Sequence, residues 1–437
     1  MNPCDLKITD IRTADINGLP KHMILLKVYT NAGIVGYGEV RDASSATYAK
    51  MLKGRLLGAN PLNVDKLFNR IKQFGGHSRQ GGGVSGIEIA LWDIVGKFYG
   101  IPVYQLLGGQ YRDRVRVYCD TDVDGKHTGH DMGLSLKARM DAGFTYLKMD
   151  LGIEMLYDEP GALNAPLGML EEMQKYSMKA ICHQSGSIDK SLMFGKNYEL
   201  FTIPHHATGI HVTEHGLDIL EDYVRQVRDV IGYEVPLAID HFGHVAIEDA
   251  IRFGRRMEKY NIAWMEDVSP WTIPERLTKF TQNCCVPLCT GEDIYLAENY
   301  EPILRAGINV VHPDLLTIGG LGETKKLGDL CEKYGTAIAL HMAESPIAFM
   351  AAVHMAAALK NVLAVEFHSV DHPEWMELVN PHISIKDGFM EVPSAPGLGI
   401  ESLNEDLIKQ FHKTDCPEPW ADTSAWDGEW ANDRIWS

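Results

Sequence analysis

The stretch 263-AWMED-267 is an apolar, strand-like run that ends in two carboxylates, Glu266 and Asp267. Short apolar runs bounded by polar residues are typical of buried strands. The same pattern recurs from about residue 114 onward, and an amphipathic helix mostly follows each run. The strands that we predict are RVRVYCD (114–120), YLKMD (146–150), VPLAID (235–240), IAWMED (262–267), VPLCTGED (286–293), INVVHPD (308–314), TAIALH (336–341) and LAVEF (363–367).

Eight parallel-type strands separated by helices favour a closed parallel barrel, although strand count alone leaves an open sheet possible. The spacing of acidic strand ends supports a regular unit, since 266 − 240 = 26 and 292 − 266 = 26. One strand and one helix fill each interval. The predicted fold class is therefore α/β, with a parallel barrel as its largest part.

The rest of the chain divides around this barrel. Residues 1–113 place strand-like runs, with a hairpin turn at 31–33, before a helical run that Gly100-Ile101-Pro102 ends, which indicates an α+β domain. The barrel is expected over 114–387. Within it, 152–213 is too long for one strand-helix unit and is predicted to be an insertion on a loop at the barrel mouth.

Five histidines lie in the predicted insertion or, in one case, two residues beyond it, and we interpret them as ordinary loop residues in preference to a zinc site because their spacing fits no common ligand pattern. They are His183, His205, His206, His211 and His215. The segment 388–437 contains four tryptophans in polar, irregular sequence, and it is expected to pack on the N-terminal domain or on a neighbouring subunit. Those tryptophans are Trp420, Trp426, Trp430 and Trp436.

Composition narrows the function. The 437 residues carry a formal net charge of −18, which disfavours binding to nucleic acid or to anionic lipid. No run of about 18 apolar residues predicts a membrane helix, and no secretion signal is expected at the N-terminus. The eight cysteines show no disulfide-like framework. We expect a cytoplasmic enzyme without a nucleic-acid or membrane partner.

Three successive strand ends carry the carboxylates Asp240, Glu266 and Glu292. In a parallel barrel the C-terminal strand ends converge on one mouth, where three unpaired carboxylates would repel one another. A divalent cation removes that repulsion, and ligation by oxygen alone suits Mg²⁺. Each acid could instead cap the following helix. The regular spacing of all three favours the metal.

The following strands end in Asp314 and His341, and the last strand carries Glu366. A carboxylate that accepts a hydrogen bond from one imidazole nitrogen leaves the other nitrogen to act as a base. On the second strand, Lys148 and Asp150 are two residues apart and share a face. Lys148 could act in catalysis or simply pair with the metal carboxylates.

These residues resemble the enolase superfamily, in the branch that contains mandelate racemase and the acid-sugar dehydratases, and the resemblance covers nearly the whole chain. It implies an N-terminal α+β capping domain, completed by the C-terminal segment, over a modified (β/α)7β barrel. GYGEV (36–40) and ALWDIVGKFYGIPVYQLLGG (90–109) are similar to capping-domain signatures. The family pattern implies metal ligation by Asp240, Glu266 and Glu292, a His341–Asp314 dyad and a carboxylate at Glu366.

The implied reaction removes the proton alpha to a carboxylate, with Mg²⁺ and Lys148 neutralising the developing charge. Racemases of the mandelate type carry a second lysine where this chain has Asp150, so dehydration is favoured over racemisation. Gluconate-type dehydratases carry a histidine, as the general acid, where this chain has Phe242. The acid is left open between His241, His244 and a dual role for His341. Asp150, His241 and Glu366 are candidate substrate-binding residues.

We therefore predict a Mg²⁺-dependent, homo-oligomeric hydro-lyase that converts an aldonate or aldarate to a 2-keto-3-deoxy acid. The nearest alternative is an epimerase, racemase or cycloisomerase that uses the same enolate intermediate. A rival from another class is a catalytically idle barrel that serves as a scaffold. Substrate-specific contacts are expected from the insertion and from His22, Arg41 or Arg79 of the N-terminal domain.

Overall fold

The computed structural model describes residues 1–19, 21–123, 126, 128–166, 168, 208–240, 243 and 245–429. Over these residues the chain forms two compact units. Unit 1 comprises Met1–Val117, Gly291–Glu301 and Val311–Ser437, and unit 2 comprises Tyr118–Thr290 and Pro302–Val310. Each unit is described by itself below.

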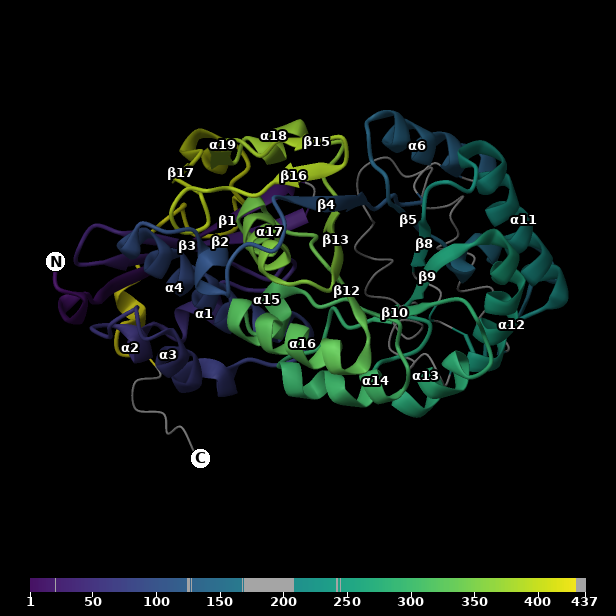
Figure 1. Ribbon diagram of the computed structural model, residues 1–437, viewed down its shortest axis with the longest axis horizontal. Helices are drawn as coiled ribbons and strands as arrows, with labels where there is room; N and C mark the ends of the chain where they lie inside the picture. The colour runs from purple at the N-terminus through teal and green to yellow at the C-terminus, as the bar shows by residue number, and fades with distance from the viewer. Residues whose placement is uncertain are drawn as a thin grey trace. The chain divides into compact units, whose positions relative to one another are not determined.

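The N-terminal part of unit 1 is a three-stranded antiparallel sheet (Figure 1). Its strands are β1 (Ile8–Leu19), β2 (Lys21–Thr30) and β3 (Val35–Val40). The predicted hairpin turn joins β2 to β3, where Gly33 has a φ of +76° and its N–H donates to the Thr30 carbonyl over 3.2 Å. Five helices follow the sheet, namely α1 (Thr47–Lys50), α2 (Lys53–Leu56), α3 (Val64–Ile71), α4 (Gly82–Tyr99) and α5 (Val103–Leu106).

Helix α4 packs directly on the backbone of β3, and glycines make this approach possible. A Cβ on Gly36 would lie 2.2 Å from the carbonyl oxygen of Ala90, and one on Gly38 would lie 2.1 Å from that of Gly86. Side chains alternate along a strand. Since positions 36 and 38 face α4, Glu39 projects from the opposite face of β3.

The described residues also contribute eight parallel-type strands, which confirm the predicted fold class. They are β4 (Arg114–Cys119), β5 (Leu147–Asp150), β8 (Leu237–Asp240), β9 (Ile262–Glu266), β10 (Leu288–Thr290), β11 (Val310–Val311), β12 (Ala337–Leu340) and β13 (Val362–Phe367). Their order in the sheet follows the chain, and β13 also pairs with β4. The fold is a (β/α)7β-type barrel with an N-terminal antiparallel-sheet domain.

Helices follow most of these strands. Those assigned to unit 2 are α6 (Gly129–Asp141), α11 (Glu214–Ile231), α12 (Ile247–Met257) and α13 (Pro274–Thr281). Those assigned to unit 1 are α15 (Leu315–Ile318), α16 (Leu321–Tyr334) and α17 (Pro346–Ala358). The short helix α14 (Glu301–Arg305) crosses the boundary between the units.

The described ends of the predicted insertion meet in a small antiparallel pair. Strand β6 (Leu163–Asn164) pairs with β7 (His211–Val212). His211 Nδ1 lies 3.1 Å from Asp249 Oδ2, and His215 is an exposed residue of α11. His183, His205 and His206 lie outside the described residues.

The C-terminal segment lies on the N-terminal sheet, and both belong to unit 1. It contains β16 (Phe389–Glu391), β17 (Ser402–Leu403) and α19 (Glu405–Gln410), and it is preceded by α18 (Pro373–Met376), β14 (Val379–Asn380) and β15 (Ile385–Lys386). Trp420 Nε1 donates to Glu405 over 2.7 Å, and Lys27 Nζ lies 3.9 Å from the centre of the Trp420 ring. The Thr423 hydroxyl donates to the Ile11 carbonyl over 2.7 Å. Trp430 and Trp436 lie outside the described residues.

No described helix combines the length and the apolar character needed to cross a membrane.

Candidate active site

Asp314 and His341 occupy the ends of neighbouring strands in unit 1. Asp314 Oδ2 lies 2.6 Å from His341 Nδ1. The other oxygen of Asp314 accepts hydrogen bonds from the N–H groups of Leu316 and Thr317, over 2.6 and 3.2 Å, because Asp314 is the N-cap of α15. An ionised carboxylate only accepts hydrogen bonds, so Nδ1 carries the proton and Nε2 faces the site.

Arg41, the residue that follows β3, forms an ion pair with Asp314. Its Nη1 lies 2.7 Å from Asp314 Oδ2 and donates to the Thr317 hydroxyl over 2.8 Å, while its Nε donates to Asp42 over 2.9 Å. The guanidinium side chain is fully buried. Burial raises the pKa of Asp314, but Arg41 and His341 outweigh burial and hold that pKa well below its ordinary value. Asp314 is therefore ionised at neutral pH.

Two further buried acids, Glu344 and Glu39, lie near Arg41 and Asp314. The sequence alone assigned neither of them a role in the site. Glu344 Oε1 lies 3.3 Å from Arg41 Nε, and burial together with the charge of Asp314 raises the pKa of Glu344 well above its usual range. Glu39 accepts hydrogen bonds from the N–H and hydroxyl of Ser345, and burial raises its pKa to about 8. Only their burial, which depends on the tertiary structure, distinguishes these acids from surface carboxylates.

The second nitrogen of His341 faces two more predicted site residues. Nε2 lies 3.1 Å from Glu292 Oε2 and 3.9 Å from Glu366 Oε2. The side chain of Glu292 is 22% exposed, whereas that of Glu366 is fully buried. His341 therefore contacts Asp314 through one nitrogen and the more open, acidic side of the site through the other.

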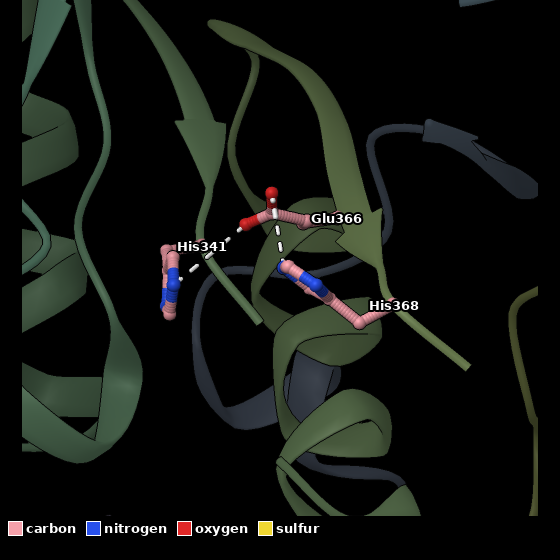
Figure 2. A group of neighbouring side chains, drawn as sticks. All are labelled: His341, Glu366 and His368. Atoms are coloured by element: carbon pink, nitrogen blue, oxygen red, sulfur yellow. Dashed lines mark ion pairs between the residues drawn. The ribbon is translucent and has the colours of Figure 1, made fainter. Parts of the chain in front are cut away.

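Glu366, on β13, lies among three imidazoles. Besides His341, its Oε2 contacts His312 Nε2 at 3.2 Å, and its Oε1 contacts His368 Nε2 at 3.3 Å. The Met342 N–H donates to Oε2 over 3.3 Å. Figure 2 shows Glu366 between His341 and His368. His312 and His368 are absent from the sequence prediction, although each lies within two residues of a predicted site residue.

In unit 2, Lys148 is a buried cation between two predicted metal ligands. Its Nζ donates to Asp240 Oδ2 over 2.8 Å and to Glu266 Oε1 over 3.4 Å. The parallel register explains this geometry, because Lys148 lies beside Ala238 and Asp150 beside Asp240 at the ends of β5 and β8.

The two carboxylates of AWMED have different partners. Glu266 receives the Trp264 indole N–H over 2.8 Å in addition to its contact with Lys148. Asp267 turns away from extended backbone, with a φ of +48°, and accepts a hydrogen bond from the Thr290 hydroxyl over 2.5 Å. Glu266 therefore joins Asp240 as a partner of Lys148 in unit 2, while Asp267 connects the end of β9 to β10.

The structure thus brings His341, Asp314, Glu292 and Glu366 together in unit 1, and it brings Lys148, Asp240 and Glu266 together in unit 2. Asp150 is the last residue of β5. The candidate substrate residue His241 lies outside the described residues, as do Phe242 and His244. Carboxylates of the kind that hold a divalent cation are present in both units.

Comparison with known proteins agrees with this arrangement. Residues 11–108 match the family model of the mandelate racemase / muconate lactonizing enzyme N-terminal domain, and residues 198–407 match that of the enolase C-terminal domain-like family. The chain is 31% identical to a D-xylonate dehydratase of Haloferax volcanii, over 93% of this chain and 89% of the relative. It is 28% identical to a D-galactonate dehydratase of Verminephrobacter eiseniae, over 94% and 96% respectively.

Solved structures give the same result. A mandelate racemase/muconate lactonizing enzyme-like protein from Rubrobacter xylanophilus has a TM-score of 0.77 at 25% identity, covering 95% of this chain and all of that chain. A putative dehydratase from Salmonella enterica has a TM-score of 0.75 at 26% identity, with coverage of 93% and 99%. The barrel and its acidic strand ends define the class of enolase-type proteins. The chain belongs to the enolase superfamily, in its mandelate racemase and acid-sugar dehydratase branch.

Proposed function

We propose that this protein is a divalent-metal-dependent dehydratase of a sugar acid. The observation that carries the proposal is the buried dyad, in which His341 Nδ1 lies 2.6 Å from an Asp314 carboxylate that Arg41 keeps ionised. A dyad of this kind presents Nε2 as a base. The named relatives, which are D-xylonate, D-galactonate and arabinonate dehydratases, supply the reaction and the substrate class.

In the proposed reaction, His341 Nε2 removes the proton from C2, alpha to the substrate carboxylate. Asp314 holds the imidazole in the required tautomer and stabilises the imidazolium that forms. The electron pair left on C2 moves into an enolate, and the hydroxyl on C3 then departs. The resulting enol becomes a 2-keto-3-deoxy acid.

Asp240, Glu266 and Glu292 are the proposed ligands of a Mg²⁺ ion. The donor set fits the ion, since all three residues offer carboxylate oxygens and the single positive charge of Lys148, 2.8 Å from Asp240 and 3.4 Å from Glu266, leaves the set negative. Oxygen-only ligation is the preference of Mg²⁺. When bound, the ion would neutralise charge that develops on the substrate carboxylate. Lys148 would add a fixed positive charge beside that carboxylate.

The substrate that we propose is a five- or six-carbon aldonate, and Asp150 and Glu366 are proposed to contact its hydroxyl groups. Support comes from the relatives, which are named for five- and six-carbon sugar acids. We also propose that the protein is cytoplasmic and homo-oligomeric. Sedimentation of the purified protein would test the oligomer, because a monomer at micromolar concentration would contradict it.

The decisive experiment is a panel of aldonates and aldarates, including D-xylonate, D-galactonate and D-arabinonate, incubated with the protein and Mg²⁺. We expect a 2-keto-3-deoxy acid from at least one of them, detected by semicarbazide absorbance and by NMR. Removal of Mg²⁺ with EDTA should stop the reaction. An epimer without a 2-keto acid would support the epimerase alternative, and no product across the panel would contradict the proposal.

A variant of His341 tests whether this residue is the base. With the active substrate, His341→Asn should lower kcat by at least about 100-fold, because general base catalysis typically contributes 10²–10⁴. His215→Asn, on the exposed surface of α11, is the matched control and should keep wild-type activity. Turnover by His341→Asn within a few-fold of wild type would show that the base is a different residue.

A further inference from the structure

His368 is a second imidazole at the carboxylate that His341 contacts. It follows the last residue of β13, and its Nε2 lies 3.3 Å from Glu366 Oε1. His341 Nε2 lies 3.9 Å from the other oxygen, Oε2. Figure 2 shows the two rings on either side of Glu366. The rings approach one another with centroids 6.3 Å apart.

The side chains of this cluster differ in how much of their surface is exposed. The side chains of Glu366 and His312 are fully buried, whereas His341 is 7% exposed and His368 is 18% exposed. His312 donates from Nδ1 to the Ala339 carbonyl over 2.9 Å, since a carbonyl can only accept, and its Nε2 meets Glu366. Glu366 and His312 thus form the fixed base of the cluster. His341 and His368 are the two members that reach its surface.

We propose that His368 is the general acid of the elimination, a role that rests on the proposed dehydratase function. With Nε2 held against Glu366 Oε1, the other ring nitrogen, Nδ1, would give its proton to the hydroxyl that leaves C3. Histidine is the side chain that most often serves as a general acid, and the contact with Glu366 fixes the orientation of this ring. In the sequence, Phe242 occupies the position at which gluconate-type dehydratases carry their acid histidine, so the acid is expected elsewhere.

The bonds and protons balance. The C2–H bond breaks, its proton goes to His341 Nε2, and its electron pair enters the enolate. The C3–O bond then breaks with its electron pair on oxygen, which takes the His368 proton and leaves as water, while C2 and C3 become doubly bonded. Ketonisation transfers the His341 proton to C3 and returns the C2 hydroxyl proton to His368. Both imidazoles regain their starting protonation states.

Both imidazoles follow the ends of neighbouring parallel strands, β12 and β13, and contact one carboxylate, so we expect the base and the acid to act from the same side of the substrate. The expected stereochemistry is therefore syn elimination. One nitrogen of His341, one nitrogen of His368 and one oxygen of Glu366 lie within 4.8 Å of one another. This separation is compatible with reaching two adjacent carbons of one substrate.

The test uses His368→Asn and the aldonate that the wild-type protein dehydrates in the panel, with Mg²⁺ in D₂O. We expect 2-keto acid formation to fall by at least about 100-fold. Exchange of the C2 proton for deuterium, followed by NMR, should persist within about tenfold of the wild-type rate of proton abstraction. His341→Asn should lose both reactions. His382→Asn, at an exposed position, is the matched control and should lose neither.

A substrate analogue whose leaving group departs with little protonation provides a second measurement. The 3-deoxy-3-fluoro analogue of the same aldonate should release fluoride with His368→Asn at a rate within about tenfold of wild type. A merely structural role for His368 would slow both substrates equally.

Three outcomes would overturn the assignment. They are dehydration by His368→Asn within about threefold of wild type, joint loss of exchange and dehydration in a folded variant, and equal slowing of the fluoro analogue. Circular dichroism and the thermal midpoint establish that the variant is folded. Failure of the dehydratase proposal itself is distinguishable, because the wild-type protein would then form no 2-keto acid from any member of the panel.

Discussion

Arg41 Nη1 lies 2.7 Å from Asp314 Oδ2, so a residue just beyond the N-terminal sheet holds the acid that orients the candidate base. The arrangement depends on β3. Glycines at 36 and 38 let α4 approach the strand, and the strand end then directs Arg41 toward Asp314. The N-terminal α+β region therefore supplies a buried positive charge to the His341–Asp314 dyad.

The first prediction concerns Arg41 itself. Arg41→Met removes the cation that faces Asp314, Asp42 and Glu344, and leaving buried charges without their partner typically costs about 3–5 kcal/mol. We expect a lower free energy of unfolding in urea and at least a tenfold lower kcat. Arg41→Lys should recover only part of both, because an ammonium cannot reproduce the planar donor geometry.

Arg225→Met is the matched control. Arg225 pairs with Asp222 and Asp229 on α11, and its side chain is 50% exposed. An exposed ion pair contributes about 0–1 kcal/mol. If Arg41→Met behaved like Arg225→Met in both measurements, Arg41 would not be required to hold Asp314.

The second prediction concerns the proposed metal ligand Asp240. Asp240→Asn should weaken Mg²⁺ binding by at least about tenfold, measured by isothermal titration calorimetry, because a neutral amide replaces a charged oxygen ligand. Activity should fall with it. Asp222→Asn, an exposed position on α11, should leave the affinity unchanged. An unchanged affinity in Asp240→Asn would remove Asp240 from the ligand set.

The third prediction is a pH dependence of stability. Burial raises the pKa of Glu39 from 4.5 to about 8, so between those values the folded state keeps a proton that the unfolded state has released. The free energy of unfolding should therefore fall as pH rises through this window. Each pKa unit corresponds to at most about 1.4 kcal/mol.

Glu39→Gln imitates the protonated acid and should remove this dependence. Relative to wild type, the variant should gain stability from pH 5 to pH 9 in urea unfolding followed by tryptophan fluorescence. Glu391→Gln, at an exposed position of β16, should show a constant difference from wild type. Parallel curves for wild type and Glu39→Gln would contradict the raised pKa.

The fourth prediction concerns the contact between β3 and α4. Gly38→Ala places a Cβ 2.1 Å from the Gly86 carbonyl oxygen, so backbone must move. Overpacking of this kind typically costs about 1–3 kcal/mol or more. We expect a lower thermal midpoint and, because Arg41 follows this strand, a lower kcat. Gly428→Ala, where a Cβ meets no atom within 4 Å, should be neutral. A Gly38→Ala variant as stable as wild type would show that the approach is not tight.

The sequence alone allowed prediction of the strand-helix repeat, the antiparallel N-terminal hairpin and the residues at the strand ends. These features follow from local periodicity, because an apolar run of strand length and its polar end are both made of consecutive residues. It also named Asp314 and His341, whose contact at 2.6 Å needs only two neighbouring parallel strands.

Only the tertiary structure decided which charges are buried together. Arg41 meets Asp314 across 273 residues of sequence (314 − 41 = 273), and no local pattern in the chain specifies that contact. Likewise, nothing in the sequence around Glu344 and His368 distinguishes them from ordinary loop residues. Only the packing of the folded chain encloses them. Burial strengthens electrostatic interactions and shifts pKa values, and burial is a property of the packed neighbours rather than of the residue itself.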